Sequence, residues 1–170
     1  MIYDIVEFPN LSLDPATHGV DFEEAVSIAK NMIETLKTFP SGVGLASPQV
    51  GINNARIIIV CTESMAISLD NKKDYTIMIL PEIVESVGQQ KSIEGCLSLG
   101  RYTGSVTRKK ELTVTYMNEH WQKVTSKFIG FEASIIQHEI DHLDGKIIID
   151  NMSKLKMNKE MAKLKKKLKL

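Results

Sequence analysis

The chain has 170 residues, of which 43% are hydrophobic and 25% charged, ordinary values for one soluble globular domain. Its formal net charge of zero is the sum of −7 over residues 1–150 and +7 over residues 151–170. The sum argues against an overall basic nucleic-acid-binding protein, whereas the basic end is typical of a segment that interacts with a partner.

The first predicted element is a helix that begins after Asp21 and ends near Thr38. Asp21 and Glu24 fit a capping box, and apolar residues then recur at helical spacing. Two strands are predicted next, Arg56–Cys61 and Tyr75–Leu80, because both runs are apolar and rich in β-branched residues. Pro81 is expected to end the second of them.

The second half of the chain begins with a predicted hairpin that joins 112–117 to 123–129. A helix from Phe131 to about Leu143 follows, and Gly145 terminates it. Since no regular βαβ alternation occurs, the order of elements predicts an α+β fold, with mostly antiparallel sheets around this central helix. A last helix carries an apolar stripe that we expect to dock on the body, formed by Met157, Met161, Leu164 and Leu168.

The cellular location is predicted from what the sequence lacks. The two cysteines make no disulfide framework, and Met1–Asp4 does not resemble a signal peptide. No apolar run approaches the roughly 18 residues of a membrane helix. We therefore expect a cytoplasmic protein with no membrane partner.

The sharpest local signal is His138-Glu139-Ile140-Asp141-His142, which falls on the central predicted helix. Positions i and i+4 share one helix face, so both imidazoles can bind one metal ion, with Glu139 beside it as a base. Chance is the alternative interpretation, but half of the four histidines lie in this motif. The motif therefore predicts a metal site.

A catalytic site of this type needs a third protein ligand and leaves a fourth position for water. Cys96, Cys61 and the carboxylates are the candidates. Cys61 ends an apolar strand and is equally well interpreted as a small buried hydrophobe, whereas Cys96 follows Gly95 outside any apolar run. A thiolate with two imidazoles suits zinc or ferrous iron. The residues by themselves favour Cys96 and leave Cys61 open.

A third segment, Gly42–Gln49, contains two glycines that allow a ligand to approach the backbone. It lacks the features of a phosphate-binding or dinucleotide-binding loop, and alone it would be interpreted as an ordinary turn. The side-chain amide of Gln49 is a neutral donor that suits stabilisation of an oxyanion.

Taken together and in order, the three segments resemble the motifs of the peptide deformylase family, which read G-x-G-L-A-A-P-Q, E-G-C-L-S and Q-H-E-x-D-H-L. They are matched here by Gly42–Gln49, Glu94–Ser98 and Gln137–Leu143. The resemblance extends more loosely over most of the chain, and the last helix is similar to that of the bacterial type-one subgroup.

The resemblance implies a metal-dependent hydrolase that removes the N-formyl group from the N-terminal methionine of nascent polypeptides and releases formate. It implies one divalent metal ion held by Cys96, His138 and His142. The ion would be ferrous iron in the cell, with zinc, nickel or cobalt possible in purified protein. The resemblance also divides the chain into a catalytic part, residues 1–150, and a basic helical tail of the same domain, residues 151–170.

Roles for other residues come from the same resemblance. Glu139 would move the proton from water to the departing nitrogen, and the Gln49 amide and the Leu97 backbone N–H would stabilise the oxyanion. The basic tail would bind the ribosome near the exit of the nascent chain. The substrate would lie against residues that include Val43, Gly44, Gly95, Phe131 and Ile135.

Some positions depart from the family pattern. Ser47 adds a hydroxyl near Gln49, Gly100 loosens the segment after Cys96, and Thr103 stands where the family has an arginine. Ser134 places a polar residue where the side-chain pocket is usually apolar. The alternatives are a divergent paralogue with altered N-acyl specificity, a general zinc protease, or a metal-stabilised adaptor that acts through its tail.

Overall fold

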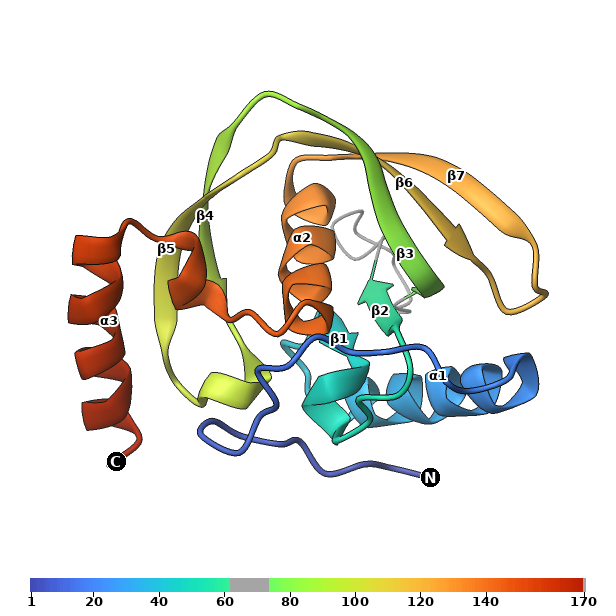
Figure 1. Ribbon diagram of the computed structural model, residues 1–170, viewed down its shortest axis with the longest axis horizontal. Coiled ribbons are helices and arrows are strands. Elements are labelled where there is room, and N and C mark those ends of the chain that lie inside the picture. Colours follow the sequence, from blue (N-terminus) through green and yellow to red (C-terminus); the bar gives the residue numbers. More distant parts are fainter. Residues whose placement is uncertain (62–73, 170) are drawn as a thin grey trace.

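Helix α2 (Phe131–Leu143) lies at the centre of the molecule in the computed structural model, which describes residues 1–61 and 74–169 (Figure 1). Two antiparallel sheets surround it, and the described elements form the expected α+β fold. The larger sheet has the strand order β1-β2-β3-β6-β7, and the smaller pairs β4 with β5. The strands are β1 (Gly44–Ala46), β2 (Ile57–Cys61), β3 (Tyr75–Val87), β4 (Gln90–Gly95), β5 (Thr103–Arg108), β6 (Glu111–Met117) and β7 (Lys123–Ile129).

Helix α1 (Phe22–Lys37) has nearly the bounds that its apolar spacing predicts. The Asp21 carboxylate accepts a hydrogen bond from the Glu24 backbone N–H, which satisfies one of the free amides of the first turn. The buried face of the helix packs against the larger sheet through residues that include Ala25, Ala29, Met32 and Leu36.

Strand β2 is buried on both faces, because helices cover the larger sheet on each side. Ile57 and Ile59 pack into the cluster that contains α1, whereas Ile58 and Val60 pack into the cluster that contains α2. This two-sided burial explains why β2 is continuously apolar rather than alternating. It also fixes α2 firmly against the centre of the sheet.

Strand β3 is longer than predicted, since Pro81 lies within it and does not end it. The pairing of β3 with β6 shifts register between Ile79 and Glu82. Proline is tolerated at such an irregularity because it cannot donate to the ladder. Beyond it, β3 continues to Val87 and leads into the smaller sheet.

The smaller sheet, β4–β5, has no counterpart among the predicted elements. Its inward-facing residues on β4 are Gln90, Ser92 and Glu94, so the strand lacks the apolar alternation by which strands are recognised. Arg108 on β5 is likewise buried and charged. These polar residues include Gln90 and Glu94, which bind side chains of α2.

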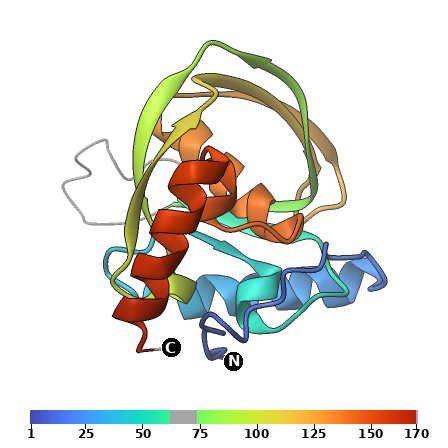
Figure 2. The same cartoon turned by 60° about the vertical axis from the view of Figure 1, so that its left-hand side comes forward.

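Helix α3 (Lys154–Lys167) lies beside the smaller sheet, at the end of the molecule away from α1 (Figures 1 and 2). Leu164 is fully buried in a cluster with Leu99 and Tyr102, as the predicted apolar stripe requires. Tyr102 also donates a hydrogen bond of 2.9 Å from its hydroxyl to Glu160. None of the described helices is long and apolar enough to cross a bilayer.

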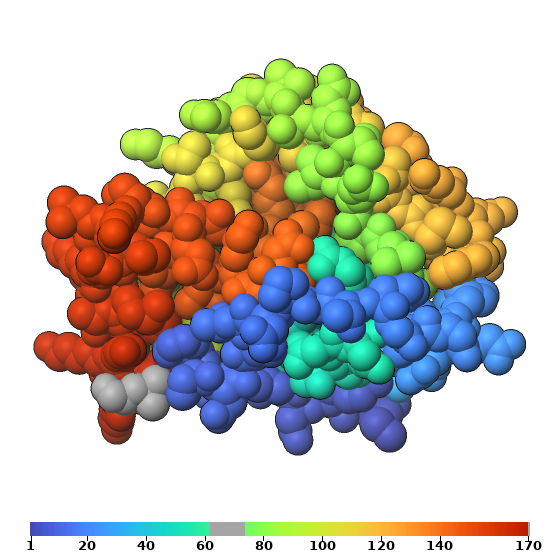
Figure 3. All heavy atoms as spheres, in the orientation of Figure 1, coloured from blue at the N-terminus to red at the C-terminus, as the bar shows by residue number. Residues whose placement is uncertain are grey.

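The N-terminal segment runs across one face of the body, as Figure 3 shows in blue. The Val6 N–H donates to the Gln49 carbonyl and the Phe8 N–H to the Ser98 carbonyl, each at 2.8 Å. The segment therefore ties two short 3₁₀ turns together, Ser47–Val50 and Leu97–Leu99.

Candidate active site

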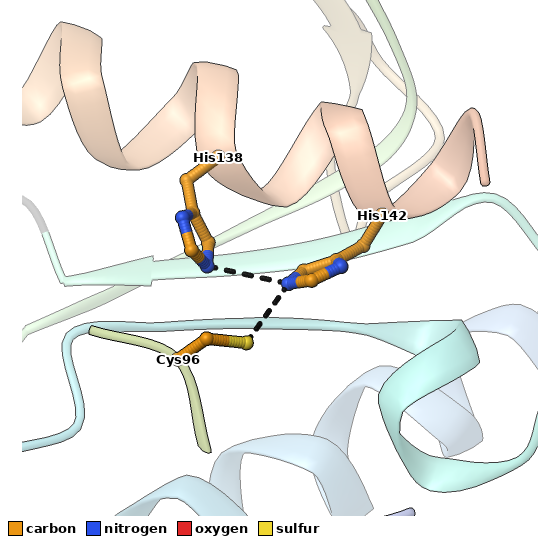
Figure 4. A group of neighbouring side chains, drawn as sticks. All are labelled: Cys96, His138 and His142. Carbon is orange, nitrogen blue, oxygen red and sulfur yellow. Dashed lines mark hydrogen bonds between the residues drawn. The ribbon is translucent and has the colours of Figure 1, made fainter. Parts of the chain in front are cut away.

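Three ligand atoms converge between α2 and the end of β4 (Figure 4). Cys96 Sγ lies 3.2 Å from His142 Nε2, which lies 3.2 Å from His138 Nε2. All three atoms fall within 4.8 Å of one another, and all three residues are buried. Cys61 instead lies at the end of β2 in the interior, outside this cluster. The tertiary structure thus brings the histidines together with Cys96, the cysteine that the family resemblance implied, and not with Cys61.

Glu94 orients the first histidine of the cluster. Its Oε2 lies 3.0 Å from His138 Nδ1, so the Nε2 atom faces the centre of the cluster. The Arg108 guanidinium donates two hydrogen bonds of 2.8 Å to Glu94 and a third to Asp141. Arg108 therefore joins Glu94 to Asp141, which also lies on α2. A carboxylate behind a ligating imidazole fixes its orientation and raises its basicity.

The electrostatics of the cluster favour a cation at its centre. Burial opposes ionisation of Cys96, but His142 and His138 hold the pKa of its thiol well below the usual range. Burial similarly raises the pKa of Glu94, yet hydrogen bonds from Arg108 and His138 outweigh it and lower the pKa to about 2. A thiolate and two imidazoles form a donor set typical of a divalent transition metal. The residues present therefore fit such an ion.

Glu139 follows His138 on α2 and is 4% exposed. Its Oε2 atom is buried and has no hydrogen-bond partner among the described residues. Burial raises the pKa of this carboxyl to about 7, partly offset by His138 and His142. The carboxylate also lines the cavity next to the cluster, where it can reach a reacting group.

Gln49 is held by both ends of its amide. Its Oε1 accepts from the Ala46 N–H at 2.8 Å, so its Nε2 points toward Cys96 Sγ at 3.4 Å and Ser98 Oγ at 3.3 Å. Leu97 directly follows Cys96, and both Gln49 and Leu97 line the cavity. The structure thereby places the Gln49 amide beside the cluster and Leu97 in the wall of the same cavity.

The cavity beside the cluster has a volume of about 550 Å³. It lies between α2, the start of β1 and the smaller sheet, and Cys96 and His138 of the three-ligand cluster line it. Every residue predicted to contact substrate lines it, namely Val43, Gly44, Gly95, Phe131 and Ile135.

The departures from the family pattern have separate structural consequences. The Ser47 hydroxyl donates to the Ala55 carbonyl at 2.6 Å and accepts from the Ile57 N–H, so it points into the interior. Gly100 has a φ of 57°, a conformation that glycine adopts without strain. Thr103 and Ser134 both line the cavity.

Sequence reasoning missed Gln90, which begins β4. Its side-chain amide donates to the Gly130 carbonyl at 2.6 Å and to Ser134 Oγ at 2.9 Å. An isolated glutamine at the start of a polar strand carries no recognisable signal, because its partners lie 40 and 44 residues further along the chain.

Comparisons with known proteins agree with this geometry. The family model described as polypeptide deformylase matches residues 2–158. A relative from Shewanella oneidensis named peptide deformylase 3 is 34% identical over 166 residues, covering 97% of this chain and 98% of its own. A peptide deformylase from Chlorobium limicola is 39% identical over 150 residues, covering 88% of this chain and 76% of its own.

Solved structures show the same relationship. A crystal structure of a peptide deformylase from Legionella pneumophila superimposes with a TM-score of 0.82 at 31% identity, covering 99% of this chain and 96% of that one. A peptide deformylase from Ehrlichia chaffeensis in complex with actinonin has a TM-score of 0.82 at 29% identity, with 98% and 97% covered.

Proposed function

The chain belongs to the polypeptide deformylase family and is a metal-dependent hydrolase that removes the N-formyl group of nascent polypeptides, and we propose how its residues divide this reaction. The observation that supports the proposal is the convergence of Cys96, His138 and His142 beside the buried carboxylate of Glu139 in one cavity. The reaction adds water to the formyl carbon and yields formate and a free amine.

We propose that Cys96, His138 and His142 hold one divalent metal ion. When bound, such an ion acidifies water and polarises the formyl oxygen. Glu94 and Arg108 keep the His138 imidazole in the orientation in which its Nε2 faces the ion.

Glu139 is proposed to accept a proton from the attacking water and to donate it to the departing nitrogen. Its position next to the cluster and its unpartnered oxygen suit this role. The Gln49 amide and the Leu97 backbone N–H donate to the formyl oxygen as negative charge develops there. The Ala46 N–H holds the side-chain oxygen of Gln49, which keeps the amide nitrogen directed toward Cys96.

The substrate backbone is proposed to lie along Gly44 and Gly95, where the absence of side chains lets an extended peptide approach. The methionine side chain would then enter the cavity beside Val43, Phe131 and Ile135. Water is displaced from these apolar walls as the side chain enters, which contributes to binding.

The decisive experiment measures formate release from formyl-Met-Ala by wild-type protein and by Glu139→Gln, each with its metal content determined. We expect kcat to fall by about 10²- to 10⁴-fold in the variant, as for loss of a general acid–base group, with the metal retained. Absence of formate release from wild-type protein loaded with ferrous iron or cobalt would refute the assignment. Cleavage of unformylated peptides would favour a protease, and turnover of acetyl-Met-Ala a paralogue with altered N-acyl specificity.

Ferrous iron is proposed as the ion in the cell, with zinc, nickel or cobalt able to replace it in purified protein. A site with one thiolate and two imidazoles accommodates all four. Metal analysis after anaerobic purification, combined with the formate assay, tests this proposal. Stoichiometric zinc with full activity and no iron would contradict it.

The tail is proposed to bind the ribosome near the exit of the nascent chain, in the cytoplasm. Residues 1–150 form the catalytic part, and residues 151–170 form a basic tail of the same domain with a net charge of +7. Lys159, Lys165 and Lys166 are exposed, so they are available to phosphate groups.

Replacing Lys159, Lys165 and Lys166 by glutamine should weaken salt-sensitive co-sedimentation with ribosomes and leave turnover of formyl-Met-Ala unchanged. The matched control replaces three exposed lysines of the body, Lys30, Lys123 and Lys146. Equal loss of co-sedimentation in both variants would show a nonspecific charge effect and contradict the proposed role of the tail.

A further inference from the structure

Ser134 gives the wall of the cavity a polar group close to the three-ligand cluster. It lies on α2 one turn before His138, three residues after Phe131, and all three residues line the cavity. Residues at this spacing share one helix face. Ser134 is 4% exposed and lines the cavity, so it is shielded from bulk solvent.

The hydrogen bond from Gln90 makes the Ser134 hydroxyl oxygen an acceptor and leaves its hydrogen free to donate. The Gln90 amide nitrogen has two hydrogens, and it donates to the Gly130 carbonyl at 2.6 Å and to Ser134 Oγ at 2.9 Å. Ser134 is therefore the acceptor in this pair. Among residues 1–61 and 74–169, the Ser134 hydroxyl donates to no partner. Its hydrogen is therefore available to a group in the cavity.

Strand β4 continues this polar wall. Gln90, Ser92 and Glu94 alternate along the strand and face inward, and Ser92 and Glu94 line the cavity. Both carboxylate oxygens of Glu94 already bind protein groups, on Arg108 and His138. Ser92 and Ser134 therefore add hydroxyl groups to a cavity that Val43 and Ile135 line with apolar side chains.

We propose that Ser134 is a specificity-determining residue, which lets the enzyme deformylate chains that begin with N-formylmethionine sulfoxide. This inference rests on the proposed function, in which the first side chain enters this cavity. Oxidation converts the thioether of methionine into a polar sulfoxide of similar size, whose oxygen is a hydrogen-bond acceptor. An apolar wall would leave that oxygen unpaired, whereas the Ser134 hydroxyl donates to it.

The test compares kcat/KM for three substrates, formyl-Met-Ala, formyl-norleucyl-Ala and formyl-Met(sulfoxide)-Ala. Norleucine has the length of methionine but no acceptor. We expect Ser134→Ala to lower the ratio of sulfoxide to methionine turnover about fivefold to tenfold, the effect of one neutral hydrogen bond. The ratio of norleucine to methionine turnover, which involves no sulfoxide oxygen, should change less than the sulfoxide ratio does.

Two further variants separate this effect from a general disturbance. Gln90→Ala removes one of two donors to the Gly130 carbonyl, which still accepts from the Ser134 N–H and can then also accept from the Ser134 hydroxyl, so the same ratio should fall in part. Ser126→Ala, on β7 and outside the residues that line the cavity, should leave the ratio unchanged.

An unchanged ratio in Ser134→Ala, or wild-type protein that does not process the sulfoxide substrate, would overturn the inference. The proposed function would still stand in both cases if formyl-Met-Ala is processed. Failure of wild-type protein on formyl-Met-Ala would instead overturn the proposed function.

Discussion

The backbone of Gly44 lies so close to the Glu139 carboxylate that no side chain fits between them. A Cβ atom at position 44 would overlap Glu139 Oε1 and lie 2.8 Å from Ile135 Cγ2. Both neighbours lie on a buried part of α2 and have little room to withdraw. The start of strand β1 therefore packs directly against Glu139, the residue that we propose as the proton carrier.

Gly44→Ala should abolish most of the activity by displacing Glu139. A misplacement of about 1 Å at a reacting group can lower kcat 100-fold, and we expect a loss of at least this size. Formate release from formyl-Met-Ala measures it, alongside metal content, which should be retained. The control is Gly19→Ala, whose Cβ would meet nothing closer than Asn54 O at 3.9 Å. More than half of wild-type kcat in Gly44→Ala would show that Glu139 can shift without consequence.

Metal removal should lower both activity and stability, because an ion bound only by the folded state stabilises it. Cys96→Ala is expected to abolish stoichiometric metal binding. Cys61→Ala, which removes an equally buried thiol outside the cluster, should keep one ion per chain. Metal analysis and thermal melts before and after chelation measure both effects. A melting temperature that does not change on chelation would contradict a metal linked to folding.

Loss of Arg108 should destabilise the protein strongly, because Glu94 and Asp141 would be left without their cation. The Arg108 side chain is 4% exposed, and breaking a buried ion pair from one side costs about 3–5 kcal/mol. Urea unfolding of Arg108→Leu measures the free energy of unfolding.

The matched control for Arg108 is Lys127→Ala, which breaks an exposed ion pair with Glu111. Solvent screens that pair, so the change in unfolding free energy should be far smaller. Comparable losses of unfolding free energy in the two variants would contradict a larger contribution from the buried ion pairs of Arg108.

Docking of α3 should depend on Leu164. Its side chain is fully buried against Leu99 and Tyr102, and Leu164→Ala is expected to cost about 2–5 kcal/mol of stability. Leu155→Ala on the same helix removes a side chain that is 87% exposed and should change stability by less than about 0.5 kcal/mol. Urea unfolding distinguishes them, and equal effects would mean that α3 does not dock through its apolar stripe.

Helical and hairpin elements could be predicted because their signals are local. The spacing of His138 and His142 places both imidazoles on one face of any α-helix, whatever the rest of the fold does. The hairpin 112–129 is likewise visible in its alternating strands, and both elements form at the predicted positions.

The smaller sheet could not be predicted, since its inward residues are polar. Gln90, Ser92 and Glu94 face α2 where a strand normally presents apolar residues, so their alternation carries no hydrophobic signal. The polar character of β4 has its reason in the site, where Glu94 orients His138 and Gln90 binds Ser134.

The sequence by itself determined the α+β class, the central helix and the two histidines on one of its faces, because short-range spacing decides these. The family resemblance already named Cys96 and Gln49, but only the tertiary structure placed the Cys96 thiol and the Gln49 amide beside the histidines and turned Ser134 toward Gln90. These choices depend on contacts between segments separated by more than 40 residues, which form when α2 packs between the two sheets.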